Sequence, residues 1–128
     1  MPSALLIEDD PSNQAVIGLM LARCGYDVQT VGSVREASEL AKCQFDVIVA
    51  DIVLPDGSGE AAAQSFGATV PLLLISGCPV SDLWHFGLLP PSALERQHFL
   101  TKPFTFREFQ EYLTQAITLS CATTQPIE

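Results

Sequence analysis

Short apolar or β-branched segments recur along the chain, separated by segments with helical spacing. The segments that predict strands are residues 4–7, 27–31, 45–50, 72–75 and 98–101. The central ones are continuously apolar rather than alternating, which is typical of strands covered on both faces. This regular alternation of strand and helix predicts an α/β fold, a parallel sheet with helices on both of its faces.

Helix boundaries are marked by local chemistry. Asp10 followed by Pro11 is an N-cap carboxylate with proline at the first helical position, and Gly25 ends the same helix. Capping is therefore the preferred role of Asp10. Residues 33–36 and 105–108 are capping boxes that open two further helices, because each begins with Ser or Thr and ends with Glu. A short alanine-rich helix is expected to end near residues 66–67, after a turn over residues 54–59.

The segment between the fourth and fifth predicted strands is irregular. The Pro90-Pro91 pair excludes one continuous fourth helix, since proline removes a backbone donor and clashes with the preceding turn. We expect a short helix over residues 81–86 and another from Ser92. The apolar residues of this segment, which include Trp84, form either local core or a partner-facing patch, and core is preferred.

Composition limits the possible classes of protein. The chain has 128 residues, and 48% of them are hydrophobic, so we expect one domain over residues 1–119 and a disordered tail over residues 120–128. No apolar run approaches the roughly 20 residues of a membrane span, and the N-terminus lacks the pattern of a signal peptide. We therefore expect a cytoplasmic protein with no membrane insertion.

Charge and cysteine content narrow the picture further. The formal net charge of −9 is opposite to that of most nucleic-acid binders, so direct DNA binding is not expected. The four cysteines contain no Cys-x-x-Cys pair, which indicates reduced thiols rather than a metal or redox site.

Polar side chains stand directly after four of the five predicted strands. Glu8 and Asp9 follow the first, Asp51 the third, Ser76 the fourth and Lys102 the fifth. The carboxyl ends of parallel strands are where ligands bind in such sheets. Converging carboxylates repel each other by roughly 4 kcal/mol per pair at 4 Å and an effective dielectric near 20, which a hard divalent cation such as Mg²⁺ relieves. A lysine adds a mobile positive charge to this group.

These strand ends resemble the receiver domains of two-component response regulators over about residues 3–119. The motifs that carry the resemblance are Ile7-Glu8-Asp9-Asp10, Asp51-x-x-x-Pro55-x-x-x-Gly59, Ile75-Ser76-Gly77 and Lys102-Pro103-Phe104. Each motif is weak alone, but all four occur in order. The resemblance implies a doubly wound, flavodoxin-like sheet with strand order 2-1-3-4-5.

The resemblance also implies a phosphorylation site. Asp51 corresponds to the residue that takes a phosphoryl group from a histidine of a sensor histidine kinase or a histidine phosphotransfer protein. Asp9, Asp51 and the backbone carbonyl of Val53 correspond to direct Mg²⁺ ligands, and Glu8 to one that acts through water. The protein would catalyse only its own phosphoryl transfer and would not be an enzyme with a separate substrate.

The remaining roles concern how the signal is read. Ser76 corresponds to the hydroxyl that meets the phosphoryl oxygens, and Lys102 to the ammonium that pairs with them. Phe99 matches an aromatic residue whose position is coupled to that hydroxyl. The alternative role for Phe99 is that of a static core residue. Val53 and Cys78 stand where polar side chains could orient a hydrolytic water, so we expect slow self-dephosphorylation.

Three functions remain to be compared. A phosphoaccepting signalling module is the leading hypothesis. A protein-binding platform that no longer accepts phosphate is the second, and the complete set of site residues argues against it. A small hydrolase with an aspartyl-phosphate intermediate would normally need an acid where Val53 stands. The chain is either a stand-alone regulator or a receiver from a hybrid sensor kinase, and it carries no signal for an oligomeric state.

Overall fold

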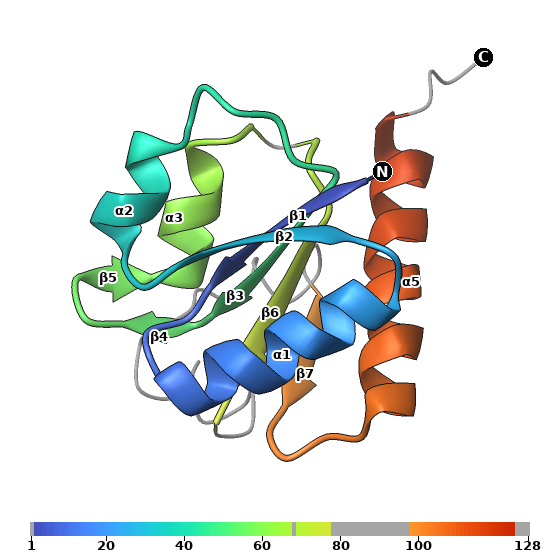
Figure 1. Cartoon of the computed structure of the whole chain (residues 1–128). Helices are drawn as coiled ribbons and strands as arrows, with labels where there is room; N and C mark the ends of the chain where they lie inside the picture. The colour runs from blue at the N-terminus through green and yellow to red at the C-terminus, as the bar shows by residue number, and fades with distance from the viewer. Residues whose placement is uncertain (1, 68, 78–97, 125–128) are drawn as a thin grey trace, which may run out of the picture.

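A parallel sheet forms the centre of the molecule (Figure 1) in a computed structural model that describes residues 2–67, 69–77 and 98–124. Its strands are β1 (Ser3–Ile7), β2 (Asp27–Val31), β3 (Val47–Asp51), β6 (Leu72–Ser76) and β7 (His98–Thr101). The spatial order is β2-β1-β3-β6-β7, and every neighbouring pair is parallel. Strands β6 and β7 are the fourth and fifth strands of this sheet along the chain. The α/β class and the predicted order 2-1-3-4-5 are therefore confirmed.

Four helices of the described residues cover the two faces of this sheet. The helices are α1 (Pro11–Arg23), α2 (Val34–Glu39), α3 (Gly59–Gln64) and α5 (Phe106–Thr124). Helices α1 and α5 lie on one face, and α2 and α3 lie on the other (Figure 1). The prediction of helices on both faces is confirmed.

Each buried strand supplies side chains to both helix layers. Within β1, Leu5 and Ile7 pack in the cluster that contains residues of α2 and α3, whereas Ala4 and Leu6 pack in the cluster of α1 and α5. Successive side chains of a strand point to opposite faces, so a strand with a helix layer on each side must be apolar at every position. This explains the continuous apolar runs of the sequence.

The predicted capping chemistry is present. In the first box, Ser33 Oγ accepts from Glu36 N–H at 3.1 Å, and Glu36 Oε1 accepts from Gly32 N–H at 2.8 Å. The second box is reciprocal, because Thr105 Oγ1 accepts from Glu108 N–H at 3.1 Å and Glu108 Oε1 accepts from Thr105 N–H at 2.9 Å. Asp10 is the N-cap of α1, as predicted.

Some element boundaries differ from the prediction. Strand β3 begins at Val47 rather than residue 45 and includes Asp51. The segment expected to be a simple turn is a hairpin of β4 (Val53–Leu54) and β5 (Gly57–Ser58). Helix α5 continues to Thr124, past residue 119, where the domain was expected to end. The predicted irregular fourth helix lies within residues 78–97 and so outside the described residues, as do residues 125–128.

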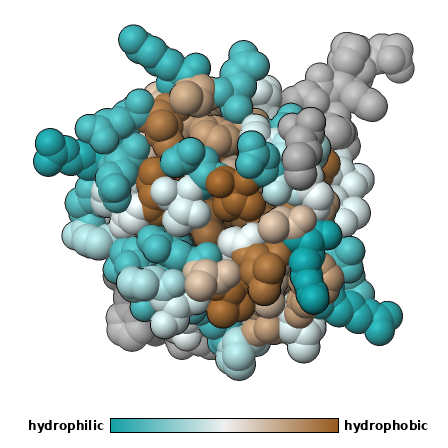
Figure 2. Space-filling model, in the orientation of Figure 1, coloured by the Kyte–Doolittle hydropathy of each residue, from teal (hydrophilic) through white to brown (hydrophobic). Residues whose placement is uncertain are grey.

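The surface combines acidic and apolar side chains. Figure 2 shows brown apolar patches among hydrophilic side chains on the face that carries α1 and β2. Two large apolar residues of α1 are exposed, Val16 at 52% and Leu19 at 62%. Among the described residues, no helix is both long and apolar enough to span a membrane.

Candidate functional site

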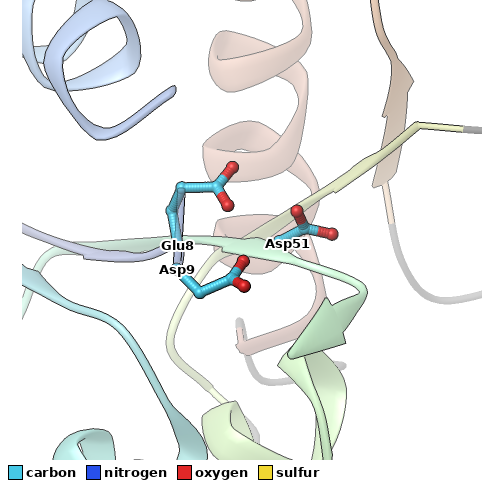
Figure 3. Close-up of side chains that lie close together, drawn as sticks. All are labelled: Glu8, Asp9 and Asp51. Atoms are coloured by element: carbon cyan, nitrogen blue, oxygen red, sulfur yellow. The ribbon is translucent and has the colours of Figure 1, made fainter. Parts of the chain in front are cut away.

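Three carboxylates converge where β1 and β3 end. Because β1 and β3 are neighbours in register, with Ile7 opposite Ala50, the residues that follow them meet at one edge of the sheet. Carboxylate oxygens of Glu8, Asp9 and Asp51 all lie within 4.8 Å of one another. Figure 3 shows the three side chains close together, with Glu8 and Asp9 extending toward Asp51.

Glu8 is the buried member of this group, with only 1% of its surface exposed. Its carboxylate accepts from Lys102 Nζ at 3.1 Å and from Asp10 N–H at 3.3 Å. Burial raises the pKa of Glu8 and nearby Asp51 adds to the rise, while Lys102 and the Asp10 N–H oppose it without cancelling it. Lys102 and the Asp10 N–H thus offset only part of the cost of burying the Glu8 carboxylate.

Lys102 is the positive side chain of the site. Its Nζ lies 3.1 Å from Glu8 Oε1 and 3.3 Å from Asp51 Oδ2. Burial lowers the pKa of Lys102, but its contacts with Glu8 and Asp51 outweigh burial and raise the pKa overall. Its backbone N–H donates to Ser76 O at 2.7 Å, which ties the end of β7 to the end of β6. Lys102 is therefore charged and held beside both acids.

Asp51 is 14% exposed and has a defined orientation. Its Oδ1 accepts from Val53 N–H at 3.1 Å, and its Oδ2 faces Lys102. A Cβ atom at Gly59 would collide with the carbonyl oxygen of Asp51. The glycine that ends the Asp51 motif is thus required by close approach of α3 to the acidic residue.

The other predicted residues lie around this group. Ser76 ends β6, is 1% exposed and stands opposite Thr101 of β7. Phe99 is half-buried and packs against the cluster on the α2 and α3 side. The side chain of Val53 is 53% exposed. Cys78, expected to influence hydrolysis, lies outside the described residues.

Two residues that sequence reasoning did not single out support the site. Gln14, in the first turns of α1, donates from Nε2 to the Glu8 carbonyl oxygen at 2.6 Å. Asp56, at the tip of the β4–β5 hairpin, accepts from the backbone of α2. Gln14 could have been predicted, because it is a polar residue that follows the acidic pair closely in the sequence. Nothing in the local pattern indicated the contact of Asp56.

The donor set suits a hard divalent cation. Three carboxylates face one ammonium, so excess negative charge remains after Lys102 is counted. Asp9 is exposed, which leaves the group accessible from solvent. Magnesium is typically held by one or two carboxylates together with phosphate oxygens and water, and all the side-chain ligands here are oxygens.

Comparison with known proteins places the chain in a family. The family model for the response regulator receiver domain matches residues 4–114. The chain belongs to this family. The receiver domain is 31% identical to the response regulator protein PilR of Pseudomonas aeruginosa over 121 residues, which are 91% of this chain. It is 32% identical to the cell cycle transcriptional regulator CtrA of Caulobacter vibrioides over 104 residues, which are 78% of this chain. It spans only 26% of the length of PilR and 43% of CtrA.

Solved receiver domains have the same architecture. The receiver domain of the sensor histidine kinase PA1611 from Pseudomonas aeruginosa is 29% identical, with a TM-score of 0.74 over 91% of this chain and 98% of that one. That structure has a magnesium ion coordinated in its active site cleft. A sensor protein from Polaromonas is 25% identical with a TM-score of 0.75, over 93% of this chain and 98% of that one. The receiver domain described here is thus a signalling domain of the two-component type.

Proposed function

We propose that Asp51 is the phosphoacceptor of this receiver domain. The observation that carries the proposal is the position of its carboxylate, held at one oxygen by Val53 N–H and at the other by Lys102 Nζ. A nucleophile held in this way is oriented before the reaction, and phosphoryl transfer depends mainly on positioning and neutralisation of charge.

The transfer step follows from this arrangement. One carboxylate oxygen of Asp51 attacks the phosphorus of a phosphohistidine, an O–P bond forms and the P–N bond breaks. The bonding electron pair returns to the imidazole nitrogen, which leaves with the histidine. Lys102 is already within hydrogen-bond distance of Asp51, so its ammonium can pair with the arriving phosphoryl oxygens. The product is an acyl phosphate, a labile group suited to a reversible switch.

Magnesium is the proposed cofactor. Asp9, Asp51 and the Val53 carbonyl would bind it, with Glu8 acting through water. When bound, the ion neutralises charge on the carboxylates and on the phosphoryl group. The excess of carboxylates over ammonium groups and the magnesium ion in the PA1611 receiver support this assignment.

The domain has no proposed substrate beyond its own aspartate. Hydrolysis of the acyl phosphate requires an oriented water, and the exposed side chain at Val53 is apolar and cannot hold one. Dephosphorylation is therefore slow, and back-transfer or a partner phosphatase limits the lifetime of the signal.

Ser76 and Phe99 form the proposed switch. Ser76 moves toward the phosphoryl group and Phe99 turns inward behind it, a two-state change that phosphorylation biases. Phe99 is half-buried and packs against the cluster of the α2 and α3 side, so part of the residue is open to solvent. NMR of the Phe99 ring with and without a phosphoryl mimic tests this step, and an unchanged ring environment would exclude the coupling.

The proposed partner is a sensor histidine kinase or a histidine phosphotransfer protein in the cytoplasm. The exposed apolar residues Val16 and Leu19 lie on α1, the helix that begins next to the acidic pair. A partner that presents its phosphohistidine to Asp51 could rest on this helix. Direct binding to nucleic acid is not proposed for an isolated domain with a net charge of −9.

Incubation with Mg²⁺ and a small acyl-phosphate donor tests the function directly. Intact-mass measurement should detect one added phosphoryl group on the wild-type protein and none on Asp51→Asn, which keeps the shape of the side chain. Omission of Mg²⁺ should suppress the adduct. A protein that acts only as a binding platform would remain unmodified in every sample.

A further inference from the structure

The hairpin that follows Asp51 is attached to a helix distant in the sequence. Asp56 Oδ1 accepts from Val34 N–H at 2.8 Å and Asp56 Oδ2 accepts from Arg35 N–H at 3.0 Å. The two donors are the first N–H groups of α2, which have no partner within a helix. Both oxygens of one carboxylate thus join the tip of the hairpin to the start of α2.

Other features fit this junction. Gly57, next to Asp56, has φ +156°, and a Cβ there would lie 3.0 Å from Val34 Cγ2, so the hairpin and the helix start are in close contact. The two N–H donors hold the pKa of Asp56 below its usual value, so the carboxylate is charged at neutral pH and interacts favourably with the helix N-terminus. Figure 1 shows the hairpin beside the start of α2.

The hairpin connects this junction to the phosphorylation site. Val53 pairs with Ser58 and Leu54 with Gly57, so the strands on both sides of Asp56 are joined by a ladder. At its other end, Val53 N–H donates to Asp51 Oδ1. A displacement of the hairpin tip would therefore move the backbone of Val53 relative to the Asp51 carboxylate.

We propose that Asp56 is a positioning residue, which attaches the β4–β5 hairpin to α2 and thereby holds the backbone of Val53 against Asp51. This deepens the proposed function and rests on it only where Mg²⁺ is concerned, because the Val53 carbonyl is a proposed ligand of that ion. Groups that hydrogen-bond directly to a metal ligand typically lower metal affinity about 10–100-fold when they are removed, and Asp56 acts one step further away, through the hairpin, so we expect the lower end of that range.

Ser33 provides a matched control. It caps the same end of α2 through its contact with Glu36 N–H, but it lies outside the hairpin. Asp56→Ala and Ser33→Ala each remove one cap from the same helix. If Asp56 were only a helix cap, the two variants would behave alike at the phosphorylation site.

Amide hydrogen exchange at Val53 and Mg²⁺ titration by calorimetry test the proposal on the full chain. We expect Asp56→Ala to accelerate exchange at Val53 and to weaken Mg²⁺ binding about tenfold, and Ser33→Ala to leave both near wild type. Equal rates of amide hydrogen exchange at Val53 in Asp56→Ala and Ser33→Ala would overturn the proposal. If the wild-type protein binds no Mg²⁺, the proposed function fails, and exchange at Val53 still decides whether Asp56 holds the hairpin.

Discussion

The two helix layers stabilise the same sheet in different ways. Helices α1 and α5 are long and bury large side chains, with Phe109 at 0% and Leu113 at 3% exposure. Helices α2 and α3 have 6 residues each and bury mainly small residues, such as Ala37 and Ala62. Isolated helices this short are unstable in water. The second layer therefore depends more on caps and close approach, and the first on apolar burial.

The difference between the two helix layers also bears on the acidic group of Glu8, Asp9 and Asp51. The hairpin that continues from Asp51 leads into α3 and is attached to α2, so the acidic group is connected to the layer built from short, capped helices. Regions with fewer buried apolar contacts open at a lower free energy and are the ones that move in regulation. We infer that changes in this layer that displace the β4–β5 hairpin or α3 alter the site more than equal losses of stability elsewhere.

Truncation of Phe109 should have the largest effect on stability. Phe109→Ala removes a fully buried ring that stacks with Phe104 at a centroid distance of 5.9 Å, and should lower the free energy of unfolding by about 3–5 kcal/mol. Phe66→Ala, on the opposite layer, removes a half-buried ring and should cost roughly half as much. Urea denaturation measures both, and equal losses would contradict the difference between the layers.

Overpacking should disturb the layer of small residues. Ala62 is 0% exposed, so Ala62→Leu should destabilise the protein by about 2 kcal/mol and also slow phosphorylation, because α3 presses close to Asp51 through Gly59. Neighbouring Ala61 is exposed, and Ala61→Leu should change stability by less than about 0.5 kcal/mol. A slowed phosphorylation rate in both variants would show that packing is not the cause.

Loss of a cap should have a smaller and local effect. Ser33→Ala and Thr105→Ala should each cost about 1 kcal/mol. Hydrogen exchange should accelerate throughout α2 in the first variant, but only in the first turn of α5 in the second, because buried side chains at Phe109, Leu113 and Ala116 hold α5 beyond that turn. If Thr105→Ala accelerated hydrogen exchange uniformly along α5, the packing of this helix would be weaker than the burial of its side chains indicates.

The smallest effect concerns the charge of Glu8 and appears as a dependence on pH. Because the pKa of Glu8 is raised in the folded state, its contribution to stability is complete below the unfolded pKa and is lost as pH rises through the folded pKa. Glu8→Gln cannot ionise, so its stability relative to wild type should increase from acidic to neutral pH. A Glu8→Gln difference that falls as pH rises would contradict the direction of the pKa shift.

The sequence predicted the features that depend on local chemistry. Strand positions followed from continuous apolar runs, and the starts of α2 and α5 followed from Ser and Thr placed three residues before Glu. The meeting of Glu8, Asp9 and Asp51 followed from the rule that parallel strands end at one edge. The strands and helix starts need only the residues of one segment. The meeting of the acidic residues also needs the order of the strands in the sheet.

Long-range contacts were not predictable in the same way. The bond between Asp56 and Val34 joins residues 22 positions apart, and two-residue strands such as β4 and β5 have no periodic pattern. The extension of α5 to Thr124 was missed because its last residues carry no apolar spacing. The near-complete burial of Glu8 also runs against the usual exposure of glutamate.

The position of the phosphoryl group tests the central claim most directly. The wild-type protein is phosphorylated with Mg²⁺ and a small acyl-phosphate donor, then reduced with borohydride, which converts an aspartyl phosphate to homoserine. Peptide mass spectrometry should find homoserine at residue 51 and nowhere else. Homoserine at Asp9, or phosphate retained on Ser76, or no product at any residue, would contradict the assignment of Asp51 as the phosphoacceptor.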